Sequence, residues 1–266
     1  MKLKETVGLI GVGNMGSSIL EGLLTKKLAE PKQIWVYDKI QDKAKEFSSK
    51  TKVQLATSNL ELVRQSQIIL LAVKPQDLAT TLGEIQEELK SPRVLVSILA
   101  GTPIQKIQKL LKSKLDIVRA MPNLGAKVAQ SMTALCGAQG QAMASTEAIF
   151  SGCGRTIRLE EKDFDLITAL SGSGPAYFFY LMELLAKEGE ERGLTAPQAK
   201  EAAVQTALGA ALLAVFSPDG PALLRERVTS KGGTTEAALK VMQAAFPAAF
   251  KQAIQAAIDR GRELSQ

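Results

Sequence analysis

Short apolar runs alternate with longer amphipathic segments over the first 160 residues of the chain. Strand-length apolar runs separated by amphipathic helices are typical of βαβ units, in which successive strands lie parallel in one sheet. The expected strands are Val7–Ile10, Ile34–Tyr37, Ile68–Val73, Val94–Ile98 and Ile117–Ala120, with weaker candidates at Thr133–Cys136 and Thr156–Leu159. The pattern predicts an α/β fold whose N-terminal domain, residues 1–160, contains a doubly wound sheet.

The pattern changes in the second part of the chain. After about Glu160 the strand-like runs stop, and residues 161–266 are rich in alanine and follow a helical period. We therefore expect an all-α C-terminal domain. Alanine lets helices approach closely but gives each helix little bulk to bury, so partner helices from a second subunit are expected. An ordinary monomeric helical bundle is the alternative.

Local signals mark several helix starts in this C-terminal part. Thr195 and Gln198 fit a capping box, which opens a helix expected to run to about Phe216. Pro221 and Pro247 are interpreted as first-turn prolines of later helices, because proline is favoured at that position.

Length and composition agree with two globular domains. The chain has 266 residues, of which 45% are hydrophobic and 23% charged, enough apolar side chains for packed cores. The formal net charge is +6, a value that could favour nucleic acid. The basic residues are scattered among acids, as in Arg225-Glu226-Arg227, without an aromatic-interleaved basic stripe. We therefore expect no nucleic-acid partner.

The absence of histidine limits the chemistry of the protein. No Ser-His-Asp triad, Cys-His pair or imidazole acid or base is available. The two cysteines, Cys136 and Cys153, do not form a CxxC pair, so no metal site and no disulfide framework are expected. Both are interpreted as reduced core thiols.

The sequence predicts a cytoplasmic protein without a membrane partner. Residues Met1 to Gly16 lack the architecture of a signal peptide, because the short apolar run is followed by glycines. The longest apolar stretch, Ala207 to Phe216, is about half of the roughly 20 residues that a bilayer requires.

A GxGxxG motif follows the first expected strand and opens a helix expected from Asn14 to Lys26. In this context Gly11 permits a tight turn, Gly13 lets the backbone approach a pyrophosphate, and Gly16 allows close packing of helix on strand. The motif predicts a Rossmann-type domain that binds NADH or NADPH. The residues assigned to the coenzyme here are Ile10, Gly11, Val12, Gly13, Asn14, Met15 and Gly16.

Asp38 ends the second expected strand, where a carboxylate can accept hydrogen bonds from the adenosine ribose and repel the 2′-phosphate of NADPH. Lys39 and Lys43 are close in sequence, and a lysine that meets the phosphate would offset this repulsion. Asp38 and Lys39 are assigned to the coenzyme. A turn-forming role for Asp38 is the alternative.

Five segments of the chain resemble the pyrroline-5-carboxylate reductase family, in its order and approximate spacing. They are Gly11–Gly16, Ala72–Pro75, Arg119–Asn123, Leu170–Tyr177 and Val228–Thr235. The resemblance implies a Rossmann domain, an interlocked helical dimerisation domain that often assembles further, and NAD(P)H-dependent reduction of 1-pyrroline-5-carboxylate to L-proline, the last step of proline biosynthesis. It also implies a homodimer or a higher homo-oligomer built from dimers.

Further coenzyme residues follow from this resemblance and from strand ends. Ala72, Val73, Lys74 and Pro75 close the third expected strand, and Ala100 and Gly101 follow the fourth. Asn59 resembles a coenzyme-contacting asparagine of the family. The alternatives are a helix N-cap for Asn59, a surface lysine for Lys74 and a plain turn for Ala100-Gly101.

The substrate is expected at Ser230, Gly232, Gly233, Thr234 and Thr235, with Met121 and Asn123 at the same end of the cleft. Paired glycines before a helix can expose backbone N–H groups to a carboxylate. The alternatives are an N-cap at Thr234 or Thr235 and, in the Met121-Pro122-Asn123 segment, a purely conformational proline. The family commonly has proline where this chain has Lys231, which loosens the loop and adds a cation.

Thr235 is the candidate catalytic residue, through a hydrogen bond to the ring nitrogen while hydride reaches the imine carbon. Another imine or β-hydroxyacid reductase of the same build, or a non-catalytic dinucleotide-binding regulator, are the alternatives.

Overall fold

The computed structural model describes residues 2–265, which form two compact units. One unit comprises residues 2–173 and 258–265, and the other residues 174–257. Residues 161–173 belong with the sheet because Phe164 is fully buried there against Ala134 and Cys136. The predicted boundary after residue 160 marks where strands give way to helices, and it stays a prediction of domain organisation.

The first unit is built on an eight-stranded sheet of order β3-β2-β1-β4-β5-β6-β7-β8. All neighbouring pairs are parallel except β6 with β7. The strands are β1 Val7–Ile10, β2 Ile34–Tyr37, β3 Gln54–Leu55, β4 Ile68–Leu71, β5 Val94–Ser97, β6 Asp116–Met121, β7 Ser131–Gly137 and β8 Gly154–Arg158. Each of the seven expected strands is present. The third is two residues shorter than expected, because the chain leaves the sheet at Ala72.

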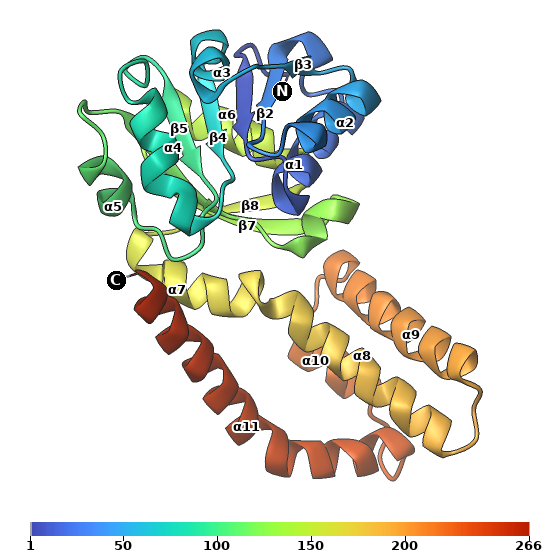
Figure 1. Ribbon diagram of the computed structural model, residues 1–266. Coiled ribbons are helices and arrows are strands. Elements are labelled where there is room, and N and C mark those ends of the chain that lie inside the picture. The colour runs from blue at the N-terminus through green and yellow to red at the C-terminus, as the bar shows by residue number, and fades with distance from the viewer. Residues whose placement is uncertain (1, 266) are drawn as a thin grey trace. The chain divides into compact units, whose positions relative to one another are not determined.

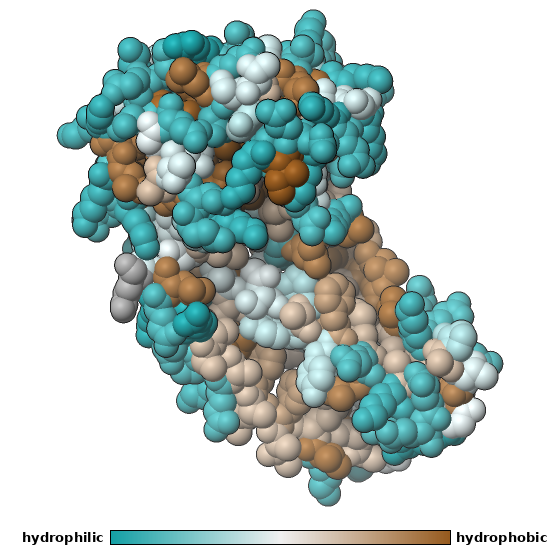
Figure 2. All heavy atoms as spheres, viewed as in Figure 1, coloured by the Kyte–Doolittle hydropathy of each residue, from teal (hydrophilic) through white to brown (hydrophobic). Residues whose placement is uncertain are grey.

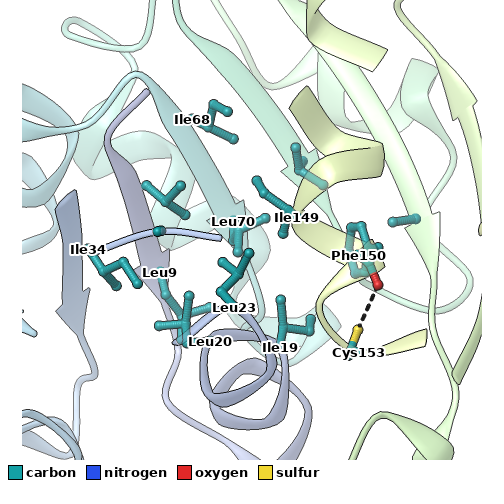
Figure 3. Packing of buried hydrophobic residues seen from close by; sticks show 14 of the residues in the cluster. Leu9, Ile19, Leu20, Leu23, Ile34, Ile68, Leu70, Ile149, Phe150 and Cys153 are labelled. Atoms are coloured by element: carbon teal, nitrogen blue, oxygen red, sulfur yellow. Dashed lines mark hydrogen bonds between the residues drawn. The ribbon is translucent and has the colours of Figure 1, made fainter. Parts of the chain in front are cut away.

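Helices cover both faces of this sheet, which confirms the doubly wound prediction. Alternate residues of β1 and β4 belong to different cores. Leu9 packs with α1 and α6 (Figure 3), whereas Ile10 packs with α3 and α4. These faces alternate because successive side chains of a strand point to opposite sides. The helices of this unit are α1 Asn14–Thr25, α2 Gln41–Thr51, α3 Asn59–Gln65, α4 Leu78–Ile85, α5 Ile104–Lys109, α6 Gln141–Ser151 and α7 Phe164–Ile167.

The second unit is helical. Its helices are α8 Gly174–Glu191, α9 Ala196–Phe216, α10 Pro221–Arg227 and α11 Thr234–Ser265, whose last turns belong to the first unit (Figure 1). Gln198 accepts hydrogen bonds from both the backbone N–H and the hydroxyl of Thr195, so the predicted start of α9 is confirmed. Pro221 opens α10 as expected.

The prediction for Pro247 is wrong, because Pro247 lies inside α11 instead of starting a helix. Proline in a helix interior removes one backbone hydrogen bond and crowds the carbonyl four residues earlier, at a cost of about 3 kcal/mol. That penalty is local, and the 32-residue helix continues on both sides of it.

The helices of the second unit leave large apolar side chains uncovered by this chain. Only Ala199 and Ala203 are buried in α9, and α11 has no buried residue among those described. Figure 2 shows tan and brown apolar residues on the surface of this unit. The exposed residues include Phe178, Phe179, Leu208, Leu212, Phe216, Val241 and Phe246. Burying a side chain of this size stabilises by about 1.5–3 kcal/mol, so an uncovered face of this kind favours association.

Helix α9 is also long and apolar enough to cross a bilayer, by length and composition alone. Its most apolar window has a mean hydropathy of 1.3, and 11% of that window is buried in this chain. The sequence estimate considered only the continuous apolar run from Ala207 to Phe216 and missed the alanine-rich first half of the helix. One such helix is weak evidence for a membrane span, since helices that pack in protein cores have the same composition.

The two cysteines are free and buried, as predicted. Cys153 lies in the core beside Phe150, whose carbonyl accepts a weak hydrogen bond from the thiol (Figure 3). Burial raises the pKa of the Cys136 thiol to about 12, with a further contribution from Glu161, and burial raises the pKa of the Cys153 thiol to about 11.

These raised pKa values predict a loss of stability at alkaline pH. The folded thiols stay neutral above their ordinary pKa of 9.0, while the unfolded chain releases its thiol protons there. Their contribution is therefore fully present below pH 9 and falls as the pH rises through 11 and 12. Urea unfolding at pH 8 and pH 10 should show this decrease, and replacing both cysteines by alanine should reduce it. Rapid labelling of the native thiols at pH 8 would contradict their protected environment.

Candidate functional site

The predicted coenzyme segments meet at one edge of the sheet. Because β1, β2, β4, β5 and β6 are parallel, their carboxyl ends lie at the same edge. Strand β1 has β2 on one side and β4 on the other, so the chain reverses its direction of winding there. The segments that leave this edge are Gly11–Gly13, Asp38–Lys39, Ala72–Pro75, Ala100–Gly101 and Met121–Asn123.

At two positions of the glycine motif, Gly11 and Gly16, the structure leaves no room for a Cβ atom. Gly11 has φ +99°, and a Cβ there would lie 2.6 Å from the carbonyl oxygen of Ala72. A Cβ on Gly16 would lie 2.6 Å from the carbonyl oxygen of Gly11. Both positions therefore require glycine to bring the loop against β4 and α1 against the loop.

Gly13 is different, because nothing lies within 4 Å of the position that its Cβ would occupy. It is the N-cap residue of α1 and, because glycine has no side chain, it does not cap the first-turn N–H groups of the helix. The first-turn N–H groups of a helix have no acceptor within the helix and carry a partial positive charge. Free donors at the start of α1 and open space at the Cβ position of Gly13 together fit a pyrophosphate, which supports the predicted role of the Ile10–Gly16 segment.

Asp38 fixes the glycine loop to the end of β2. One carboxylate oxygen accepts a hydrogen bond from the Val12 N–H and the other from the Ile40 N–H, both at 2.8 Å. Asp38 therefore does stabilise the turn, as the alternative interpretation expected. A carboxylate oxygen can accept more than one hydrogen bond, so Asp38 can also accept hydrogen bonds from a ribose.

Lys39 is bound by an acid that the sequence did not single out. Its ammonium lies 2.8 Å from both carboxylate oxygens of Asp77, in the turn that follows Lys74 and Pro75. Lys74 itself is exposed and forms the N-cap of that turn.

Asn59 is the first residue of α3 and is buried, while Ser58 caps the helix by accepting a hydrogen bond from the Glu61 N–H. The N-cap alternative for Asn59 is therefore wrong. Its amide nitrogen donates to Glu84 at 2.6 Å, and its amide oxygen has no hydrogen-bond partner among the described residues. A buried amide with an unused acceptor is compatible with a contact to a ligand hydroxyl.

Contacts within the first unit hold the turns after β5 and β6 in place. Gly101 has φ +63° and packs against Leu264 of α11, which sequence reasoning did not identify as a neighbour. Asn123 accepts a hydrogen bond from the Gly125 N–H and donates to the Ser171 hydroxyl. These contacts use the side-chain oxygen of Asn123 and one of its amide hydrogens within the fold, so Asn123 helps to hold the turn after β6.

The predicted substrate loop begins α11 in the helical unit. Gly232 has φ +73°, and its N–H donates to the carboxylate of Glu236 at 2.6 Å. The Gly233 N–H donates to the Ser230 carbonyl. These two donors are already engaged, whereas Thr234 and Thr235 form the first turn, where N–H groups lack helical acceptors. Glu236, four residues after Gly232, is the local signal that the sequence interpretation missed.

Among residues 2–265, no three histidine, cysteine, aspartate or glutamate side chains are grouped to hold a metal ion.

A doubly wound sheet with a glycine loop and an uncapped helix N-terminus at its switch point defines a dinucleotide-binding protein of the Rossmann class. The chain is 37% identical over 265 residues to pyrroline-5-carboxylate reductase of Pseudomonas aeruginosa, covering 98% of this chain and 97% of the relative. It belongs to the pyrroline-5-carboxylate reductase family. The family model for pyrroline-5-carboxylate reductase dimerisation matches residues 161–264, and a model for coenzyme F420-dependent NADP oxidoreductases matches residues 6–101.

Solved structures show the same likeness. The fold is similar to a pyrroline-5-carboxylate reductase from Coxiella burnetii, with a TM-score of 0.94 and 34% identity over 99% of this chain and 100% of that chain. It is also similar to the Plasmodium falciparum pyrroline carboxylate reductase with NADP bound, with a TM-score of 0.88 and 27% identity over the full length of both chains.

Proposed function

We propose that this protein reduces 1-pyrroline-5-carboxylate to L-proline with NADPH or NADH as the coenzyme. The observation that carries the proposal is the open, uncapped N-terminus of α1 at Gly13, in a chain that matches this reductase family over its length. When bound, the dihydronicotinamide would supply a hydride to the imine carbon and be oxidised, and the proton on the ring nitrogen would come from water or from a substrate bound as the iminium. The residues of the chain bind both molecules, orient them and keep competing water reactions away.

In this proposal the edge of the sheet binds the coenzyme. The N–H groups at the start of α1 bind the pyrophosphate, and Asp38 accepts hydrogen bonds from the adenosine ribose. Asn59 and the segment Ala72–Pro75 border the coenzyme. Ala100 and Gly101 follow β5 and are proposed to approach the nicotinamide half of the coenzyme, although a Cβ on Gly101 itself would meet Leu264.

The loop from Ser230 to Thr235 binds the substrate carboxylate in this proposal. The first-turn N–H groups at Thr234 and Thr235 are the donors, because those of Gly232 and Gly233 have acceptors within the chain. Each charge-assisted hydrogen bond contributes about 1.5–3 kcal/mol. Thr235, whose side chain is half-buried, is proposed to hydrogen-bond the ring nitrogen. Met121 and Asn123, at the end of β6 in the first unit, are also proposed as substrate residues.

The test is oxidation of NADH and NADPH, followed by absorbance, with purified protein and 1-pyrroline-5-carboxylate. Rapid oxidation that depends on the substrate, with L-proline as the product, is expected. Turnover of another cyclic imine or a β-hydroxyacid, but not of this substrate, would assign a different reductase. Binding of coenzyme with no turnover of any such compound would indicate a regulator.

We also propose that the exposed apolar faces of α8, α9 and α11 are covered by a second copy of the chain in a cytoplasmic homodimer or a larger assembly of dimers. The match of residues 161–264 to the dimerisation model supports this, and the same contact would cover α9 without a membrane. Light scattering should give at least twice the mass of one chain. A monomer at working concentration would contradict the proposal.

A further inference from the structure

An ion pair connects the two loops that flank β1 at the coenzyme edge. Lys39 follows β2, and Asp77 ends the turn that follows β4. Both carboxylate oxygens of Asp77 lie 2.8 Å from the Lys39 ammonium. Strand β1 lies between β2 and β4 in the sheet, so the pair joins loops from the two sides of the switch point.

The position of this pair matters for the adenosine end of a coenzyme. Asp38, the carboxylate placed to accept hydrogen bonds from the ribose, is the residue directly before Lys39. NADH and NADPH differ only at this ribose, where NADPH carries a 2′-phosphate. A lysine beside Asp38 is the kind of group that would bind this phosphate, and in this structure it is bound by a carboxylate instead.

We propose that Asp77 is a specificity-determining residue for the coenzyme, because it holds Lys39 away from a 2′-phosphate and so favours NADH over NADPH. This inference rests on the coenzyme part of the proposed function but not on the substrate. Two carboxylates and one ammonium leave a net negative charge near the ribose, which a phosphate must approach. Removing the Asp77 charge would therefore have two effects. It would release Lys39, and it would reduce the electrostatic repulsion of the 2′-phosphate.

Solvent screening limits the energy of the Lys39–Asp77 ion pair. The Lys39 side chain is 69% exposed and that of Asp77 is 29% exposed. An exposed ion pair contributes little to stability, so Asp77→Asn is expected to fold normally. A lysine that becomes free to bind a doubly charged phosphate is expected to change the affinity by about tenfold, which corresponds to about 1.4 kcal/mol.

The test compares binding of 2′,5′-ADP and ADP to the full-length protein by calorimetry, with no turnover required. In Asp77→Asn the dissociation constant for 2′,5′-ADP should fall about tenfold, while that for ADP stays within about twofold. Glu87→Gln is the matched control, because it removes one negative charge from another exposed lysine pair, Lys112–Glu87, elsewhere on the unit. It should change neither constant by more than about twofold.

A second variant tests whether the released lysine causes the gain. Adding Lys39→Ala to Asp77→Asn should abolish the tighter binding of 2′,5′-ADP, and high salt should weaken the gain in the single variant. An unchanged constant for 2′,5′-ADP in Asp77→Asn would overturn the inference, as would a gain that persists without Lys39. ADP binding in every variant shows that the site is folded. Failure of imine reduction with these binding results intact would count against the proposed reaction only.

Discussion

Replacing Gly13 by valine is expected to weaken coenzyme binding by about 100-fold, or about 2.7 kcal/mol, without a comparable loss of stability. Gly13 has φ −85° and ψ −178°, an extended conformation that valine adopts readily. Its Cβ would meet no atom of the protein within 4 Å. The added methyl groups would instead occupy the space from which a pyrophosphate reaches the N–H groups of α1.

Two other glycines make this prediction specific. Gly83 lies on an exposed part of α4 and also has open space at its Cβ position, so Gly83→Ala should leave coenzyme binding unchanged and slightly stabilise the helix. Gly11→Ala should lower stability and binding together, because of its positive φ and the nearby Ala72 carbonyl. Calorimetry with NADH and thermal unfolding measure both effects. Normal coenzyme affinity in Gly13→Val would place the pyrophosphate elsewhere.

Replacing Thr235 by alanine is expected to lower kcat about 10- to 100-fold, because one hydrogen bond to a charged or polarised group is worth about 1.5–3 kcal/mol. The dissociation constant for NADH should stay within about twofold, since Thr235 belongs to the helical unit and the coenzyme residues to the sheet. Steady-state kinetics with both substrates varied, together with direct measurement of NADH binding, separates these effects.

Thr235→Ser provides the matched comparison for this hydroxyl. Serine keeps the hydrogen-bonding group and the first-turn position in α11, so it should recover most of the lost turnover. If the alanine and serine variants lose activity equally, the methyl group or the packing of the helix start matters, and Thr235 does not act through its hydroxyl. Unchanged kinetics in Thr235→Ala would remove the residue from the mechanism.

Much of the sheet could be predicted because a buried parallel strand is a continuous apolar run bounded by turn residues. Val7–Ile10 and Ile34–Tyr37 have the predicted bounds. Strand β3, Gln54–Leu55, is only two residues long and half-polar, so no run marks it. The antiparallel direction of β7 was also not predictable, since an apolar run gives the position of a strand but not its direction.

The helical part was predictable where a signal is local. The side chain of Gln198 reaches back to Thr195 within one turn, so a segment of four residues determines the start of α9. At Pro247 the local signal does not determine where the helix begins. Proline fits the first turn of a helix, yet a long helix can also continue through it, and packing decides between these outcomes.

In the candidate site, the features of the glycine motif are local in sequence, whereas the side-chain contacts join residues far apart in sequence. The positive φ of Gly11 and the open backbone at Gly13 belong to a motif of six consecutive residues. The acceptor for Lys39 is 38 residues away at Asp77, and the donor to Glu84 is Asn59, 25 residues before it. No pattern along the chain relates these residues.

The sequence by itself determined the class of fold, the seven longer strands, the coenzyme loop and the family, because apolar period, glycine spacing and turn chemistry act between neighbouring residues. Only the tertiary structure decided which charges meet at the coenzyme edge, which N–H groups of the Ser230–Thr235 loop already have acceptors, and which helix faces stay uncovered. These depend on strand order and helix packing. The sheet brings the loops after β2 and β4 to either side of β1, and so gives Lys39 its partner.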